Sequence, residues 1–142
     1  MMVRKASAVW NGSLKQGKGT ISTESGALSN TPYSFATRFE GVRGTNPEEL
    51  IGAAHAGCFT MALSAQLGEA GLTAESLETS AAVTLEKIEA GWTVTKIHLD
   101  VAARIPGASQ AAFDKAAANA KAGCPISRLL KAEITMTATL NA

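Results

Sequence analysis

The feature that most constrains the fold is a long segment without charge. From Leu50 to Leu67 the only polar residues are His55, Thr60, Ser64 and Gln66. A helix that is apolar nearly all round is buried on most of its sides, and two glycines and a histidine make this one a poor membrane span. We therefore predict a long buried central helix. Because one domain of 142 residues has difficulty surrounding such a helix, we expect a second copy of the chain to cover part of it.

The residues before this segment are a strong helix start. Asn46 is a good N-cap, because its side-chain oxygen can accept from free N–H groups of the first turn. Pro47 then falls at the first helical position, where a missing N–H costs nothing. Glu48 and Glu49 follow in the first turn, which favours carboxylates. The helix is therefore expected to begin at Pro47 and to end near Gly71.

Length, charge and cysteine content narrow the class of protein. The 142 residues fit one domain, 1–142, and the net charge of +1 without a basic stretch does not indicate a nucleic-acid partner. No apolar signal segment follows the N-terminal Arg4 and Lys5, so we expect a cytoplasmic protein that is not inserted in a membrane. Two distant cysteines do not make a secreted disulfide scaffold.

The first part of the chain has the pattern of three strands. Residues 3–11 alternate weakly and end at an Asn-Gly turn signal, and residues 17–24 resemble a second strand. Residues 33–39 alternate with a period of two, which predicts a third strand with its aromatic residues on one face and Arg38 on the other. Three strands in succession predict an antiparallel meander.

The remaining elements follow the long helix. Two strands with a hairpin turn at Ala90-Gly91 and a bulge near Lys96 precede a helix capped by Ser109. The predicted ranges are 76–89 and 92–105 for these strands, 109–122 and 125–130 for two helices, and 132–140 for a closing strand. Strands and helices that are segregated in this way indicate an α+β fold.

Cys58 lies in the third turn of the predicted central helix, and it reacts only as a thiolate. The helix dipole does not reach that far, and burial would raise its pKa. A reactive Cys58 therefore needs a nearby cation. One candidate is His55, which is three residues earlier and shares a helix side, although a buried core histidine bonded to a backbone carbonyl is the simpler interpretation.

The other candidate cation is Arg38. Arginine stays charged and binds carboxylates bidentately, so a first-turn glutamate could hold it. At about 100° per residue, Glu48 lies about 80° from Cys58 around the helix and Glu49 about 180°. Glu48 is therefore the better partner on the Cys58 side, with Glu49 left to the cap. An exposed strand charge for Arg38, and simple first-turn charges for both glutamates, remain open alternatives.

Cys124 stands between Gly123 and Pro125 at a predicted helix start, where thiols are often accessible. It could attack an oxidised Cys58 and close a disulfide, which needs Cα atoms about 4.4–6.8 Å apart. Two histidines and two cysteines without short spacing do not form a zinc motif, so no metal site is expected.

Four blocks of sequence resemble the OsmC/Ohr family. They are STESG at 22–26, TRFEG at 37–41, TNPEELIGAAHAGCF at 45–59 and KAGCPIS at 121–127. The blocks occur in the family's order, and the similarity extends over essentially the whole chain. It is closer to the OsmC branch than to the organic hydroperoxide resistance branch.

The resemblance implies a thiol-dependent peroxidase that reduces organic hydroperoxides, and hydrogen peroxide more weakly, in oxidative or osmotic stress defence. It implies antiparallel sheets around the central helix in an intertwined homodimer, with active sites at the subunit interface. Cys58 would be the peroxidatic cysteine and Cys124 the resolving one, with Arg38 and Glu48 as the family's arginine and glutamate. No bound cofactor is implied, only an external dithiol or dihydrolipoyl-type reductant.

Two rival functions are open on the residues alone. A Cys58/His55 pair would suit an acyl-transfer enzyme or a hydrolase that has no need of Cys124. Alternatively, the protein would be a non-catalytic binding or redox-sensing dimer in which Cys58 is oxidised without repeated turnover.

Overall fold

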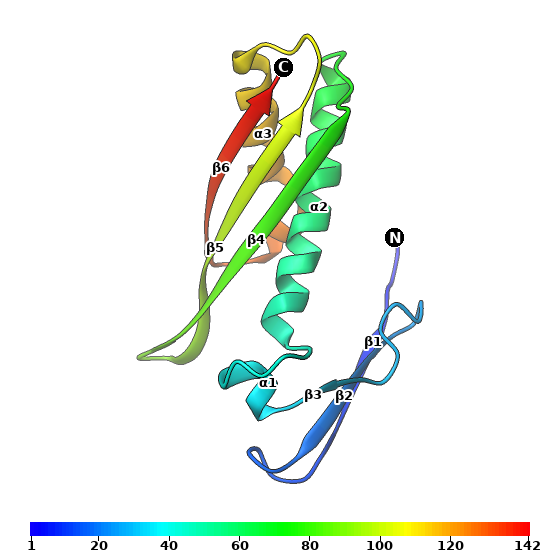
Figure 1. The fold of residues 1–142 in the computed structure, drawn as a ribbon, viewed down its shortest axis with the longest axis vertical. Coiled ribbons are helices and arrows are strands. Elements are labelled where there is room, and N and C mark those ends of the chain that lie inside the picture. Colours follow the sequence, from blue (N-terminus) through cyan, green and yellow to red (C-terminus); the bar gives the residue numbers. More distant parts are fainter. The chain divides into compact units, whose positions relative to one another are not determined.

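The computed structural model describes all residues from Met1 to Ala142, and these divide into two compact units. The first unit is Met1–Leu50 and the second is Ile51–Ala142. The division falls inside helix α2 (Pro47–Glu69), so α2 is one continuous helix with residues in both units (Figure 1).

The first unit begins with an antiparallel meander. Its strands are β1 (Ala6–Asn11), β2 (Lys18–Thr23) and β3 (Thr31–Tyr33), with β2 in the middle. Both neighbouring pairs are antiparallel, as the sequence predicted. The turn after Asn11 uses Gly12 at a φ of 98°, a conformation that a glycine adopts without steric cost.

The predicted third strand is wrong beyond Tyr33. Residues Phe35–Phe39 form a short helix, α1, instead of continuing the strand. Ser34 caps this helix by accepting from the backbone N–H of Thr37, and the Thr37 side chain accepts in return from the Ser34 N–H. Phe35 and Phe39 are four residues apart, a spacing that fits a helix turn as well as a period of two, and their rings lie 4.9 Å apart.

Helix α2 starts as the sequence predicted. The Oδ1 atom of Asn46 accepts from the backbone N–H of Glu49 at 2.8 Å. The residues of α2 that are buried fall on one stripe: Gly52, His55, Phe59, Leu63 and Leu67. By length and composition alone α2 could cross a membrane, a test that the core helices of soluble proteins also pass.

The second unit contains a three-stranded sheet in the order β4 (Ser76–Ile88), β5 (Gly91–Arg104), β6 (Glu133–Asn141). Strands β4 and β5 are antiparallel, whereas β6 runs parallel to β5. The prediction of antiparallel sheets is therefore wrong for β6. The chain passes through two helices between β5 and β6, and a crossover of that length permits parallel pairing.

The β4–β5 hairpin differs from prediction by one residue. Glu89 and Ala90 form the turn, and Gly91, with a φ of 117°, already belongs to β5. The predicted bulge near Lys96 is confirmed. Thr84 pairs with Lys96 and the next residue of β4 pairs with Val94, which leaves one extra residue in β5.

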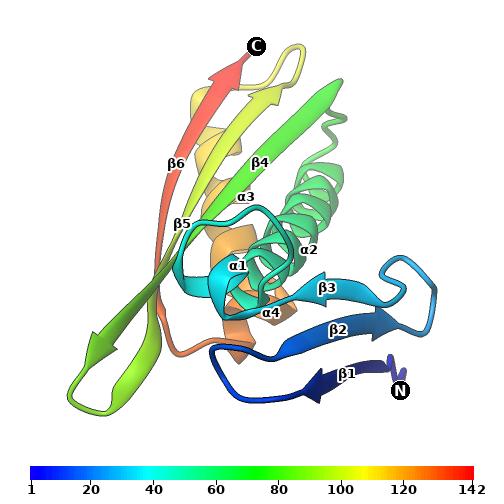
Figure 2. The same cartoon turned by 60° about the horizontal axis from the view of Figure 1, so that its bottom comes forward.

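Helices α3 (Gln110–Gly123) and α4 (Pro125–Leu129) match the predicted helices closely. Ser109 caps α3 by accepting from the backbone N–H of Ala112 at 3.1 Å. Figures 1 and 2 show α2 and α3 on the same face of the β4–β5–β6 sheet. The core between them is fully buried and includes Phe59, Leu63, Ile97, Leu99, Val101 and Phe113.

Candidate active site

In the first unit, Arg38 and Glu48 form a bidentate ion pair. The Nη2 and Nε atoms of Arg38 donate to Oε1 of Glu48 at 2.7 and 3.1 Å, and Nε also donates to Oε2 at 3.3 Å. The Arg38 guanidinium lies 5.2 Å from the centre of the Phe39 ring. Arg38 therefore pairs with the glutamate that the helical-wheel argument favoured. It is held in one orientation although 36% of its side chain is exposed.

In the second unit, the two cysteines meet as free thiols. Cys58 is half-buried in the third turn of α2, and Cys124 is the N-cap of α4 with 1% of its surface exposed. Cys58 packs against the buried core that includes Cys124, and the pKa of Cys58 responds to Cys124 and to the backbone N–H of Ile126. Residues that are 66 positions apart in the chain are thus neighbours, which disulfide formation between them requires.

The surroundings of Cys58 within this unit disfavour the thiolate. Burial is the main effect and raises the pKa of Cys58. The hydrogen bond and the charge of Cys124 raise the Cys58 pKa as well, and only the Ile126 N–H lowers it. No positive charge contributes. The site therefore holds the two sulfur atoms together but lacks the cation that a reactive thiolate needs.

His55 forms no hydrogen bond with Cys58. Its Nε2 atom lies 2.7 Å from the Oγ atom of Ser127, and that Oγ atom lies 3.1 Å from the Sγ atom of Cys124. The ring is completely buried, and burial lowers the pKa of His55, so the imidazole is neutral at neutral pH. The polar partner of His55 is a hydroxyl group rather than the expected backbone carbonyl. The Cys58/His55 pair of the acyl-transfer hypothesis is not formed.

Comparison with known proteins identifies the family of this chain. A family model of OsmC-like proteins matches residues 40–139. Peroxiredoxin OsmC of Escherichia coli K12 is 58% identical over 133 residues, which cover 94% of this chain and 93% of that protein. The chain belongs to the OsmC family.

Solved structures of the OsmC fold agree with the architecture. An OsmC-like protein of unknown function from Vibrio cholerae has a TM-score of 0.77 with 20% identity, and the match covers 97% of this chain and 99% of that one. The organic hydroperoxide resistance protein OhrB of Bacillus subtilis has a TM-score of 0.68 with 23% identity, with 96% and 98% covered. At these identities the likeness shows the fold alone.

The sequence of this OsmC-family chain pointed to Cys58, Cys124 and His55. It did not predict the backbone N–H of Ile126 near Cys58 or Ser127, the residue that links His55 to Cys124. A signal was present in the segment Cys-Pro-Ile-Ser: a capping residue at position 124 places residue 127 at the third helical position, where its N–H faces the cap. The structure contains no cluster of three or more potential metal ligands.

Proposed function

We propose that Cys58 is the peroxidatic cysteine and Cys124 the resolving cysteine of a thiol peroxidase that acts on organic hydroperoxides. The observation that carries the proposal is the proximity of the two free thiols, one half-buried and the other enclosed. The curated relative from Escherichia coli is named a peroxiredoxin, and the relative of similar fold from Bacillus subtilis is named for organic hydroperoxide resistance.

The proposed cycle uses cysteine chemistry and no bound cofactor. The Cys58 thiolate attacks the outer oxygen of the hydroperoxide, the O–O bond breaks, and the alkoxide takes a proton and leaves as an alcohol. Cys58 is then a sulfenic acid, which condenses with Cys124 to a disulfide and releases water. An external dithiol, such as a dihydrolipoyl group, restores both thiols by exchange and is itself oxidised to a disulfide.

In this proposal Arg38 supplies the cation that the second unit lacks. All effects on the Cys58 pKa except one amide hydrogen bond oppose ionisation. A guanidinium near the sulfur would favour the thiolate and would also offset the charge that develops on the leaving alkoxide. The bidentate bond to Glu48 keeps the guanidinium oriented for that role.

We further infer that Arg38 and Glu48 act on Cys58 of a second subunit. The resemblance to the OsmC/Ohr family implies a homodimer with its active sites at the subunit interface. Cys58 has no cation among its neighbours within the second unit. A partner subunit in such a dimer can supply the missing positive charge.

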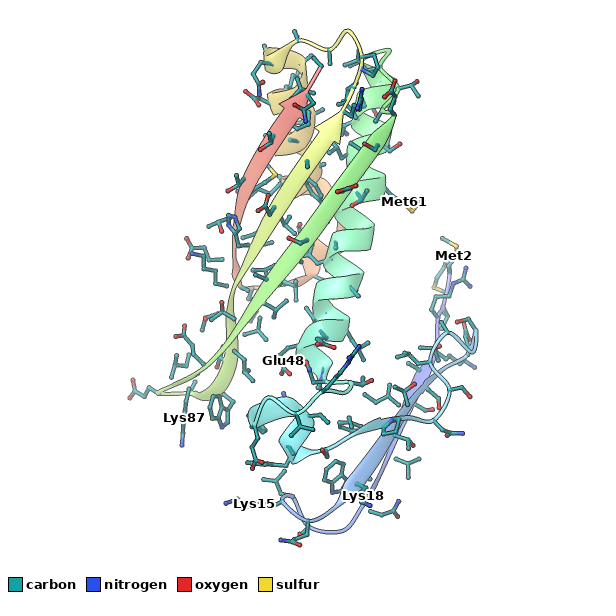
Figure 3. The ribbon with its side chains drawn as sticks, viewed as in Figure 1. Met2, Lys15, Lys18, Glu48, Met61 and Lys87 are labelled. Atoms are coloured by element: carbon teal, nitrogen blue, oxygen red, sulfur yellow. The ribbon has the colours of Figure 1, made fainter.

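The outer face of α2 supports the dimer. Met61 is 78% exposed in one chain, and Figure 3 shows its side chain pointing away from the sheet. The other exposed positions between His55 and Leu67 are uncharged: Gly57, Ser64 and Ala65. An uncharged helix face is poorly suited to solvent and well suited to packing against its own copy. We propose that residues 1–142 act as one OsmC-like domain in a cytoplasmic homodimer.

Mass spectrometry of the fully reduced protein tests this function. One equivalent of cumene hydroperoxide, without reductant, should produce a species 2 Da lighter, with the peptides of Cys58 and Cys124 linked (a disulfide replaces two S–H bonds). In Cys124→Ser, oxidation should stop at a Cys58 sulfenic acid that dimedone labels. An unmodified wild-type protein after exposure to the hydroperoxide would refute the proposal.

A further inference from the structure

Next to Cys124 lies a buried row of hydrogen-bonded side chains that the proposed peroxidase cycle does not use. It runs from His55 through Ser127 to Cys124, with separations of 2.7 Å for Nε2 to Oγ and 3.1 Å for Oγ to Sγ. The exposed fractions are 0%, 9% and 1%, respectively. Ser127 contacts Cys124 twice, since its backbone N–H also donates to Sγ at 3.3 Å.

The other ring nitrogen of His55 determines which atoms donate and which accept in these hydrogen bonds. Nδ1 is buried and has no hydrogen-bond partner. Buried N–H groups without an acceptor are rarer than unpaired acceptors, so the hydrogen-bond network assigns the proton to Nε2. Nε2–H then donates to the Oγ atom of Ser127. The hydroxyl proton of Ser127 is left to point at the sulfur of Cys124.

We propose that Ser127 is a catalytic residue of the disulfide-forming step and that His55 is the residue that positions its hydroxyl group. The Cys124 sulfur receives two donors from Ser127, the backbone N–H and the side-chain O–H, and both strengthen as the sulfur becomes a thiolate. This inference rests on the proposed role of Cys124 as the resolving cysteine.

The step balances without a further reagent. Cys124 gives up its proton, and its sulfur attacks the sulfur of the Cys58 sulfenic acid. The S–S bond forms as the S–O bond breaks, and the hydroxide that leaves takes up a proton to become water. The electrons come from the Cys124 thiol, and the oxidant is the sulfenic acid that the hydroperoxide has already produced. Ser127 and His55 keep their own protons throughout.

Few ionisable groups face Cys124. They are Cys58 and His55, both on α2. The nearest charged residues along the adjoining helices are Lys121 in α3 and Arg128 in α4, and neither side chain forms a hydrogen bond or ion pair. The Ser127 donors are therefore the principal polar contacts available to a Cys124 thiolate inside the fold.

Rapid-quench mass spectrometry separates this step from the peroxide step. In Ser127→Ala, oxidation of Cys58 by cumene hydroperoxide should keep its wild-type rate, while conversion of the sulfenic acid to the disulfide should slow by roughly tenfold or more, the effect of one hydrogen bond to a charged group. Ser127→Thr, which keeps the hydroxyl, should recover most of the rate. Ser80→Ala, which removes an exposed hydroxyl from β4, is the matched control and should behave as wild type.

A pair of substitutions at His55 tests the positioning role. The amide of His55→Gln can still donate to Ser127, whereas His55→Leu has a similar bulk and cannot. Disulfide formation should be slow in His55→Leu and largely restored in His55→Gln, and equal rates in the two would overturn the positioning role. Wild-type disulfide formation in a folded Ser127→Ala would overturn the role of Ser127. A failure of the proposed function itself would look different, because wild type would then form no sulfenic acid.

Discussion

At the scale of single residues, the decisive quantity is the charge around Cys58. Burial and the neighbouring Cys124 raise the Cys58 pKa, and the Ile126 N–H is the only group in the second unit that lowers it. A half-buried thiol in such a place is a slow nucleophile unless a cation reaches it. The Arg38–Glu48 pair is the best-ordered candidate, because three hydrogen bonds and the Phe39 ring restrict the guanidinium.

Arg38→Ala should therefore raise the pKa of Cys58 further and slow its reaction. In a Cys124→Ser background, alkylation of Cys58 by iodoacetamide at pH 7 should fall by about tenfold or more, the effect of removing a nearby opposite charge. The loss should shrink as the pH rises toward full ionisation. Arg104→Ala is a matched control, because it removes an arginine from another ion pair, 2.9 Å from Glu75, that is far more exposed. Equal loss in both variants would remove Arg38 from the mechanism.

The buried His55 should make the free energy of unfolding depend on pH. Burial lowers its pKa below the ordinary 6.5, so the unfolded chain binds a proton that the folded chain resists. The free energy of unfolding should therefore be unaffected by His55 above pH 6.5 and should decrease as the pH falls below that value, with a slope of at most about 1.4 kcal/mol per pH unit for one proton. Denaturant unfolding at fixed protein concentration should show a shallower acid dependence in His55→Gln. An unchanged dependence would contradict the assignment.

At the scale of elements, sequence patterns predicted most of the fold because their signals are local. Asn46 and Ser109 marked helix starts, and the strands of the β4–β5 hairpin followed from alternation. Segment 35–39 was predicted as a strand because a four-residue spacing of phenylalanines fits the period of a strand as well as that of a helix. The cap at Ser34 favours the helix. The parallel pairing of β6 depends on the end of the sheet at which β6 begins after helices α3 and α4. No local sequence pattern encodes that position. The contact of Ser127 with Cys124 is local and could have been predicted from the cap, whereas its link to His55 joins residues 72 positions apart and could not.

The uncharged outer face of α2 leads to a prediction about dimer formation. Met61→Glu places a charge on an uncharged helix face that we propose is covered by a second copy. Sedimentation velocity should show a shift from dimer toward monomer at micromolar concentration, because burying an unpaired carboxylate is costly. Ala118→Glu, at an exposed position in α3, adds the same charge outside that face and should leave the dimer intact. A Met61→Glu protein that remains dimeric would place the subunit interface elsewhere.

At the scale of the whole molecule, we propose that each active site is completed by two subunits. The first unit holds an oriented guanidinium, and the second unit holds two adjacent thiols whose surroundings oppose ionisation. The lack of a cation around Cys58 within the second unit is the reason to propose that the partner subunit supplies one. The dimer in this account is part of the active site as well as a source of stability.

Mixing the inactive Cys58→Ser variant with the slowed Arg38→Ala variant tests this assignment. A heterodimer of Cys58→Ser with Arg38→Ala contains one site with both native residues if Arg38 acts across the interface. It contains no such site if Arg38 acts within its own chain. Subunits exchanged under mild denaturant and then refolded together should recover up to about a quarter of wild-type peroxide turnover, since random pairing makes half of the dimers mixed and each mixed dimer has one complete site. A mixture no more active than the average of its two parents would assign Arg38 to the cysteine of its own chain.

Steady-state reduction of cumene hydroperoxide with a dithiol reductant distinguishes a peroxidase from a redox sensor. Wild type, Cys58→Ser and Cys124→Ser are compared side by side. We expect repeated turnover by wild type, none by Cys58→Ser, and in Cys124→Ser a marked slowing or a stop after one oxidation. A wild-type protein that consumes no more than one equivalent, however much dithiol is supplied, would contradict the peroxidase and support a redox sensor.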